Sequence, residues 1–582
     1  DAGLLSVATT GSSADSLKLD AIYDMQAGSG GRGAQVDISA LKIAVTSGSP
    51  TGIDPDAVLL DAGTLNALGA DSLFIGGTRS SNGDTTTLAV GAQSVTLAND
   101  AVHALQAGEI MLAATDTLTL KSGSAIDAQG STGDAGAYET AGNGAFVRAA
   151  STTASFTRSG SPDRSQGTLV GEVGSTVTAA DSITLDATLA NDYQGTATFA
   201  KNGGAVAGNL AVGATRVNFG AAPTGAEGIT YSQAELDGLD LKSLALTSYS
   251  TFDLYGDVRV GQLDANGKPV MQSLVLQGAG LAGVDNAGQT AQLNAQNLTL
   301  ANAAGATFMS GGAPGSGDLA VTADTLTLGV GDKAIQGFSA VTVTANELVA
   351  ATGTGSLAIA APATLNVARI SGEKASNQSL TAAGALTVAQ RTSDRTLAPV
   401  TALGAKWAMQ GTSVDFNSHA ELPSGTFKLA ATAGDVELGA NAQVDVAGRA
   451  VQFFDVTKPS WGGTAEFVSD NGNVEFVAGS KVNVSAAAGG DAGTLIVRAA
   501  KGTVSLADGS VRGAVPADAD GQRGEGARAV IDTGTLASFS ALNTALNSGG
   551  FDGERDLRVR TGDVSIASTD VVKAQVIKIS VD

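Results

Sequence analysis

The stretch that decides the fold reads GTFKLAATAGDVELGANAQVDVAG over residues 425–448 and GTAEFVSDNGNVEFVAGSKVNVSA over residues 463–486. The two copies align without a gap, and a shorter third copy, GTLIVRAAKGTVSLADGSVRGA, follows at 493–514. A fourth copy, GEIMLAATDTLTLKSGSAIDAQG, lies far upstream at 108–130. Such self-similarity at a short fixed period is typical of a repeat architecture.

Each copy contains three short segments in which apolar and polar side chains alternate. In the first copy these segments are 427–429, 436–438 and 444–446, separated by turn-forming residues. Alternation with a period of two indicates a strand with one buried face. Stacked copies would place apolar residues in three inward columns: Phe427, Ala465 and Leu495; Val436, Val474 and Val504; Val444, Val482 and Val511. The pattern therefore predicts an all-β fold, a right-handed parallel β-helix solenoid with three strands per coil and loop excursions.

Two other all-β folds compete with the solenoid. A β-sandwich needs antiparallel hairpins, and the pair Asn471-Gly472 does lie between two expected strands. The equivalent turns carry Ala433-Gly434 and Lys501-Gly502, however, so this turn is not specific to a hairpin. A propeller blade would need four strands in about 40 residues, whereas each copy has three. The sequence therefore favours the parallel β-helix.

The same alternating triplets recur along the remaining chain, so we expect one continuous solenoid over residues 1–582. Three segments lack the periodicity and are predicted to leave the wall as excursions: 131–176, 190–235 and 515–555. Within the last, apolar residues recur at helical spacing over 536–546, and Asn-Ser-Gly-Gly follows at 547–550. That pattern predicts a short helix packed on the outside of the coil.

The composition restricts the classes of function. The 582 residues include 33 Lys and Arg against 56 Asp and Glu, which gives a formal net charge of −23. Nucleic-acid binding and docking on anionic membranes both need a cluster of basic residues, and the sequence has none. Charged residues make up only 15%, which disfavours a highly charged disordered chain. The chain has no cysteine, so no disulfide is expected.

The sequence predicts neither a membrane helix nor a signal peptide. No run of about 20 apolar residues occurs, so the chain is not expected to span a membrane. Residues 1–20 lack the basic and apolar regions of a signal peptide. Both ends stop within the strand pattern, whereas a solenoid needs polar caps, so we expect an internal segment of a longer chain.

The few candidate metal ligands do not form a convincing site in the sequence. The two histidines, His103 and His419, lie in distant repeats, which disfavours a histidine-based metal site or catalytic triad. The turn 470–473 (Asp-Asn-Gly-Asn) offers oxygen ligands for calcium, but no series of calcium-binding nonapeptides accompanies it. We therefore predict no metal site and no cofactor.

Two pairs of carboxylates were weighed as catalytic groups. Glu437 and Glu475 align on stacked strands, and Asp54 and Asp56 are close in the sequence. A retaining glycosidase needs two carboxyl groups about 5 Å apart, which neighbouring strands would allow. Neither basic nor aromatic residues cluster near the first pair, however, so solvated side chains are the simpler explanation. We predict no catalytic residues.

The loop between the two best copies is the candidate ligand-contact loop. It contains Lys458 and Trp461, and Trp461 is one of only 2 tryptophans in the chain. A tryptophan in such a loop can stack on a sugar ring, or it can close the loop against the wall. Lys458 and Trp461 are therefore the two residues that we predict could contact a ligand.

The repeats resemble the large filamentous haemagglutinin-like exoproteins of two-partner secretion. The resemblance rests on GDVELGANAQVDVAG (434–448), GNVEFVAGSKVNVSA (472–486) and GTVSLADGSVRGA (502–514). The segments SLFIGGTR (72–79) and EIMLAA (109–114) are also similar to large members of this family. The family's secretion domain, with its Asn-Pro-Asn signals, and its carboxy-terminal toxin or anchor have no counterpart in this sequence.

The resemblance implies a secreted protein that is held at the outer surface of a bacterium after export by an outer-membrane transporter partner. The chain would then be the shaft of an adhesin, a rod without enzymatic activity. It would present loops to host cells, other bacteria or a polysaccharide matrix, and its ligand, a surface glycan or a protein, stays open. The alternatives are a polysaccharide lyase or glycosidase on the same fold, and a phage-type tail fibre.

Overall fold

The computed structural model describes residues 2–582 except 20, 22, 26, 30, 32, 49, 50, 84 and 131–135. Strands make up 51% and helices 4%, so the fold is all-β with long parallel sheets, as predicted. The chain forms two compact units. Unit 1 comprises residues 1–255, 271–280 and 302–311, and unit 2 comprises 256–270, 281–301 and 312–582. The continuity of one solenoid over the whole chain stays a prediction.

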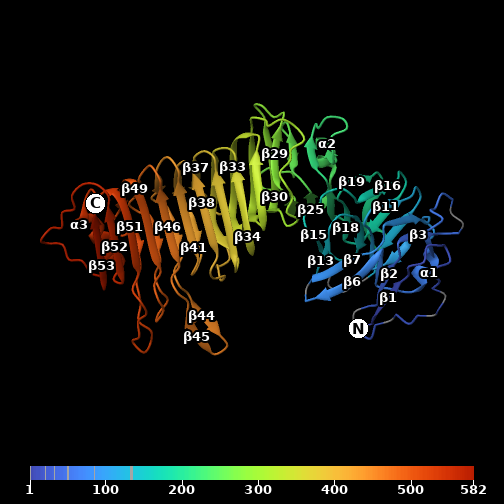
Figure 1. Cartoon of the computed structure of the whole chain (residues 1–582), viewed down its shortest axis with the longest axis horizontal. Coiled ribbons are helices and arrows are strands. Elements are labelled where there is room, and N and C mark those ends of the chain that lie inside the picture. The colour runs from blue at the N-terminus through green and yellow to red at the C-terminus, as the bar shows by residue number, and fades with distance from the viewer. Residues whose placement is uncertain are drawn as a thin grey trace. The chain divides into compact units, whose positions relative to one another are not determined.

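Unit 2 is built from parallel strands that stack in register (Figure 1). The copy that begins at residue 425 supplies β41 (Thr426–Ala431), β42 (Val436–Leu438) and β43 (Gln443–Asp445). The next copy supplies β46 (Thr464–Ser469), β47 (Val474–Phe476) and β48 (Lys481–Asn483), each of which pairs with its counterpart. The third supplies β49 (Thr494–Leu506) and β50 (Val511–Arg512). Each of these repeats therefore contributes to three separate parallel ladders.

The predicted columns are confirmed position by position. Phe427 pairs with Ala465, and Ala465 pairs in turn with Leu495 on the next strand. All three side chains are fully buried. The valines pair in the two other predicted columns, and each is at most 6% exposed. Stacking like residues in adjacent strands removes apolar surface from water, at about 25 cal/mol per Å². The strand register of the structure is therefore the one that the alternation of apolar and polar residues predicted.

The same ladders extend through the rest of unit 2. Strand β49 joins two of them, because its residues 494–499 pair with β46 and its residues 504–506 pair with β47. The other ladder strands are β27 (Arg259–Val260), β29 (Gly280–Val284), β30 (Thr290–Ala301), β31 (Gly317–Leu328), β32 (Gly331–Gln336), β33 (Phe338–Ala350), β34 (Gly353–Ile359), β35 (Ala363–Gly372), β36 (Ser376–Ala382), β37 (Leu386–Gln390), β38 (Lys406–Gly411), β39 (Val414–Asn417), β40 (His419–Glu421), β51 (Arg528–Thr535), β52 (Glu554–Val559) and β53 (Val576–Val581).

Unit 1 has a core of three mostly parallel sheets, in which β14 (Ala145–Ala150) and β21 (Gly204–Ala205) run antiparallel to their neighbours. Its largest set of strands is β1 (Leu4–Ala8), β2 (Gln35–Ser39), β5 (Ser72–Ile75), β10 (Glu109–Ala114), β14 (Ala145–Ala150), β18 (Ser182–Ala187), β22 (Gly208–Ala214), β25 (Leu241–Ser248) and β28 (Ser273–Gln277). A second sheet has the order β19 (Ala190–Tyr193), β16 (Thr168–Gly171), β11 (Thr117–Leu120), β8 (Ser94–Ala98), β3 (Lys42–Thr46) and β4 (Val58–Asp61). A third has the order β21 (Gly204–Ala205), β20 (Thr196–Lys201), β17 (Thr176–Ala179), β12 (Ala125–Ala128) and β9 (Leu105–Ala107). Strands β23 (Val217–Gly220), β24 (Ile229–Tyr231) and β26 (Phe252–Tyr255) and helices α1 (Ala62–Ala67) and α2 (Gln233–Gly238) complete the unit.

A further four-stranded sheet covers part of this core, and we call it the covering sheet. Its order is β15 (Ser155–Ser159), β13 (Ala137–Ala141), β7 (Thr85–Val90) and β6 (Gly77–Asn82). A small apolar core of its own lies beneath it, formed by Phe74, Leu88, Met111, Ala113, Tyr138 and Phe146. The outer faces of β5, β10 and β14 are therefore buried rather than solvated.

Three ion pairs are buried under the covering sheet. Two of them join the covering sheet to the core, and the third joins two neighbouring core strands. Arg79 Nε lies 2.7 Å from Asp37, Arg148 Nε lies 2.7 Å from Glu109, and Arg158 Nε lies 2.7 Å from Asp186. Every one of these six side chains is at most 4% exposed. Ser72 and Tyr138 donate further hydrogen bonds to Glu109. Buried charges need such partners because leaving them unpaired is costly.

The predicted excursions 131–176 and 190–235 are wrong in part, and residues 131–135 lie outside the described residues. Strand β14 runs antiparallel between β10 and β18, and β16 pairs with β11 and β19. Likewise β20 pairs with β17, and β22 pairs with β18 and β25. Strands β13 and β15 lie in the covering sheet instead of the core. The alternation was invisible in β14 because both of its faces are buried, which removes the period of two.

The predicted helix near the end of the chain is confirmed as α3 (Phe539–Gly549). Ser538 caps it by accepting a hydrogen bond from the backbone of Ala541. Gly550 ends it with a φ of 78°, a left-handed conformation that glycine adopts without strain. The surrounding excursion 515–555 is wrong in part, because β51 lies within it and pairs with β49 and β52.

Candidate functional site: an aromatic hairpin

A hairpin interrupts the regular repeats between β43 and β46. Its strands are β44 (Ala450–Phe453) and β45 (Val456–Pro459), which pair only with each other. Figure 1 shows the pair extending away from the stacked strands of unit 2. The hairpin is therefore an appendage on the ladders, placed by the rigid strands on either side of it.

Hydrogen bonds at its base hold the hairpin to the ladder. The Ser460 N–H donates to the Arg449 carbonyl at 2.8 Å, and the Arg449 N–H donates to the Ser460 hydroxyl at 2.7 Å. Ser424, in the preceding turn, places its hydroxyl 2.7 Å from that of Ser460. Ser460 is only 5% exposed, so these bonds are shielded from water. The base of the hairpin is consequently well defined.

The far end of the hairpin exposes large apolar side chains to solvent. Phe454 is fully exposed at 102%, Phe453 is 58% exposed and Val456 is 45% exposed. Trp461, which follows Ser460 at the base of the hairpin, is also 62% exposed. Single apolar residues on a surface are ordinary, but a group of them on one projecting element marks an interaction site. The hairpin is therefore the candidate binding element of unit 2.

Phe454 also has an unfavourable backbone conformation. Its φ is 51°, in the left-handed region that bulky residues seldom adopt. The Gln452 side chain donates to the Phe454 carbonyl at 2.7 Å, and Thr457 donates to the Gln452 side chain at 2.6 Å. These bonds hold the turn in place and direct the phenyl ring outward. Backbone strain of this kind is found most often at functional sites.

The structure places Lys458 on this hairpin and Trp461 next to its base. Lys458 is exposed on β45, and the Trp461 side chain is 62% exposed while its carbonyl accepts a hydrogen bond from Ser424 at 2.7 Å, so both roles considered for Trp461 stay predictions. Sequence analysis missed Phe453 and Phe454. The signal that could have found them is the pair Phe453-Phe454 followed by Asp455, two large apolar residues next to a turn former between alternating segments.

Of the two candidate carboxylate pairs, Glu437 and Glu475 lie in a column of exposed side chains on neighbouring strands. Asp415 pairs with Glu437, and Glu437 pairs with Glu475, so three like charges stack on neighbouring strands. Partial burial, and then the neighbouring carboxylates of Asp415 and Glu475, raise the pKa of Glu437. Asp54, in contrast, lies 2.8 Å from Lys42, and this hydrogen bond lowers the pKa of Asp54. Asp54 and Asp56 are thus partners of a lysine.

The suggested calcium ligands are used within the repeats instead. Asn471 donates to the Thr432 carbonyl at 2.7 Å and accepts from Lys501 at 2.7 Å. Asn473 accepts from the backbone of Thr503 at 2.9 Å. Among the residues that the structure describes, no group of three or more His, Cys, Asp and Glu side chains is arranged to hold a metal ion. The turn 470–473 therefore serves to link neighbouring repeats.

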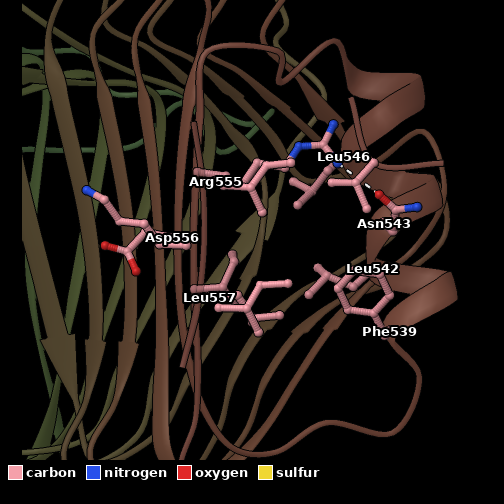
Figure 2. A pocket seen from close by; sticks show the side chains of 13 residues that line it. Phe539, Leu542, Asn543, Leu546, Arg555, Asp556 and Leu557 are labelled. Carbon is pink, nitrogen blue, oxygen red and sulfur yellow. Dashed lines mark hydrogen bonds between the residues drawn. The ribbon is translucent and has the colours of Figure 1, made fainter. Parts of the chain in front are cut away.

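A cavity between α3 and the last strands of unit 2 is too small for a ligand. Its volume is about 30 Å³, enough for a water molecule or two. In Figure 2, Phe539, Leu542 and Leu557 point into it, while Asp556 points away. Arg555 donates to Asn543 at 2.9 Å, to Asn547 at 2.8 Å and to the Phe551 carbonyl at 2.8 Å. Burial lowers the pKa of Arg555, whose bonds attach α3 to β52.

Comparisons of the chain with protein-family models, with curated proteins and with solved structures found no match. No helix among the described residues has both the length and the apolar character needed to cross a bilayer.

Proposed function

We propose that this chain is the shaft of a secreted bacterial surface adhesin, and that the β44–β45 hairpin contacts its ligand. The observation that carries the proposal is the hairpin itself, a projecting element that keeps Phe453 and Phe454 in water, with Trp461 exposed next to its base. Exposing these side chains is unfavourable unless a partner covers them. The ligand is a surface glycan or a protein, and the rod displays the hairpin without enzymatic activity.

We further propose that the three ladders close into a right-handed β-helix. The proposal is supported by the order of the strands, since each repeat visits the three ladders in turn before the next repeat begins. It is also supported by the three columns of buried side chains, which need a common interior. A solenoid of this kind grows by adding repeats and suits a shaft that holds a binding element at a distance.

Binding to cells and glycans tests the hairpin. Purified chain carrying Phe454→Asn or Trp461→Ala should bind bacteria, host cells or a glycan array at least about tenfold more weakly than the unaltered chain. Asparagine tolerates a positive φ, so the first substitution leaves the turn intact. Val102→Ser is the matched control, because Val102 is also apolar and 87% exposed but lies in unit 1. Equal binding by all variants would contradict the proposal.

The carboxylate column is the one observation that favours an enzyme. A glutamate with a raised pKa beside an ionised carboxylate is the pair that glycosidases use. The chain should nevertheless release no reducing ends from pectin, alginate, hyaluronan or bacterial exopolysaccharide. Turnover that is present in the unaltered chain and lost in Glu437→Gln would replace the adhesin proposal by a glycosidase.

A further inference from the structure

Unit 1 contains a second candidate binding site, a cavity of about 470 Å³. A volume of this order is typical of small-molecule sites. Its walls come from β18, β19, β20, β22, β24 and α2, all within residues 185–239. The lining side chains that matter below are Leu185, Asn191, Asp192, Tyr193, Tyr231 and Glu235.

The cavity exists because β19 is the last strand of its sheet. In that six-stranded sheet β19 pairs with β16 and lies at the edge. The apolar side chains of Leu185, Leu210 and Val212 therefore form a floor that no further strand of this sheet covers. Residues 228–231 and α2 line the opposite side. The result is a hollow with an apolar floor and polar groups along its wall.

One acceptor in the wall has no partner. The Asn191 amide nitrogen donates to the Leu185 carbonyl at 3.1 Å and to the Gly213 carbonyl at 2.9 Å. These two bonds fix the orientation of the amide, and its oxygen Oδ1 is buried without a hydrogen bond. Because this oxygen has almost no accessible surface, a ligand in the cavity does not reach it, and Asn191 serves to join β19 to residues 185 and 213.

Two tyrosines supply aromatic surface. Tyr231 stacks on Phe219, with ring centroids 6.3 Å apart, so its ring is held in place from behind. The Tyr193 hydroxyl donates to the Thr196 carbonyl at 3.1 Å, which orients the second ring. Burial raises the pKa of both phenols, so both stay neutral at physiological pH. Rings with fixed positions are suited to the apolar face of a sugar.

The charges in the wall select against anions. Asp192 and Glu235 are the charged residues that line the cavity, and neither lysine nor arginine lines it in the described chain. The Glu235 carboxylate accepts from the backbone and the hydroxyl of Ser232, both at 2.7 Å, as the cap of α2. Asp192 is exposed and accepts from Gln194 at 2.8 Å. A ligand here should be rich in donors and carry no negative charge.

We propose that this cavity binds one neutral saccharide unit of about hexose size. Its hydroxyl groups donate to Asp192, and its C–H face lies on Tyr193 or Tyr231. The site is separate from the β44–β45 hairpin and does not depend on the adhesin proposal. The ligand is a sugar rather than a cationic amine because the tyrosines and the apolar floor need an apolar face to cover them.

Ligand-detected NMR on the whole chain tests this site. Glucose, galactose, mannose and N-acetylglucosamine are the probes, and at least one should show saturation transfer that is lost on addition of a competing sugar. Tyr193→Leu should weaken this binding by at least about tenfold, and Asp192→Asn by about threefold. Asp192 is exposed, so its variant keeps the fold and preserves the test if Tyr193→Leu is unstable.

Phe454→Asn is the control that separates this site from the hairpin, and it should leave sugar binding in unit 1 unchanged. The proposal is overturned if none of the four sugars gives a signal. It is also overturned if both cavity variants bind as the unaltered chain does, or if putrescine binds and the sugars do not. Loss of sugar binding in Phe454→Asn alone would assign the sugar to the hairpin instead.

Discussion

Unit 1 and unit 2 differ in the solvent exposure of the outward side of their strands. In unit 2 the residues between the buried columns reach the surface, as Lys428 and Glu437 do. In unit 1 the outward side of β2, β10 and β18 lies under or beside the covering sheet, where Asp37, Glu109 and Asp186 are buried. The outward side of a parallel ladder can therefore be exposed to solvent, as in unit 2, or be covered by another sheet, as in unit 1.

The difference shows how each unit specifies its structure. The apolar columns of unit 2 tolerate any neighbour that is apolar and of similar size. The buried ion pairs of unit 1 require particular partners, because a charge left alone in the interior is strongly unfavourable. We therefore expect unit 2 to depend on packing and unit 1 to depend on the exact pairing of charges.

The largest effect is expected for a charge placed in a column of unit 2. Val474 is fully buried between Val436 and Val504, so Val474→Asp loses its apolar burial and buries an unpaired carboxylate. The expected loss of folding free energy is about 4 kcal/mol or more. Limited proteolysis should then cut within 425–514, while unit 1 stays intact.

The neighbouring residue is the matched control for that substitution. Glu475 is exposed one position along β47, so Glu475→Lys should change the free energy of unfolding by about 0.5 kcal/mol or less. Equal effects of the two substitutions would mean that the register of β47 is wrong.

A somewhat smaller loss is expected when an ion pair of unit 1 is broken. Glu109→Gln leaves the guanidinium groups of Arg79 and Arg148 with one carboxylate fewer beneath the covering sheet. Removing one member of a buried pair typically costs about 3–5 kcal/mol. Hydrogen exchange should show the loss in β6, β7, β13 and β15. Removing Glu466, whose pairs with Lys428 and Arg498 are partly exposed, should cost about 1 kcal/mol or less.

Acid should act on Glu109 of unit 1 and Glu437 of unit 2 with opposite sign. Burial opposes ionisation of Glu109, but Arg148, Ser72 and Arg79 outweigh it and lower the pKa of that carboxyl. Its contribution is therefore present above the ordinary glutamate pKa of about 4.3 and is lost as the pH falls through the lower folded value. The pKa of Glu437 is raised, so protonation favours the folded state, and this contribution is lost as the pH rises through the folded value.

Protease resistance of each unit between pH 7 and pH 3 measures these two responses. Relative to Glu437→Gln, unit 2 of the unaltered chain should become slightly more resistant as the pH falls from 7 toward 4.5, and this comparison removes the opposing loss from His419, whose pKa is lowered by burial. Unit 1 should become less resistant only below about pH 4. Glu437→Gln should abolish the gain in unit 2. A gain that persists in Glu437→Gln would assign it to another group.

The smallest effect on stability is expected at the tip of the hairpin. Phe454 is fully exposed and has a positive φ, so Phe454→Asn removes little packing and relieves some backbone strain. The free energy of unfolding should change by about 0.5 kcal/mol or less. A large destabilisation in a thermal melt would show that Phe454 supports the fold and would weaken the case for a binding element.

Much of unit 2 could be predicted because its side chains obey a local rule. The alternation around Val436, Val474 and Val504 assigns each residue to the inside or the outside without reference to distant parts of the chain. Helix α3 was predictable for the same reason, since its spacing and its terminal glycines are local signals. The hairpin was visible only as an insertion that contains Lys458 and Trp461.

The buried layer of unit 1 could not be predicted in this way. Asp37 and Arg148 look like solvent-facing residues of their strands, and only the covering sheet makes them part of the interior. That sheet is formed by four strands between residues 77 and 159, and no local pattern states where they dock. The cavity beside Tyr193 and Tyr231 was equally hidden, because it depends on where β19 ends its sheet.

By itself, the sequence of this protein determined the class of the fold, the register of the repeats at 425–514 and the place of α3, because alternation and capping act between near neighbours. Only the tertiary structure decided that the outward carboxylates of unit 1 are buried, that Phe453 and Phe454 share an exposed hairpin tip, and that two tyrosines line one hollow. Those outcomes depend on which distant segments cover a strand and which leave it open. A strand's own sequence encodes its two faces, but not what packs against the second one.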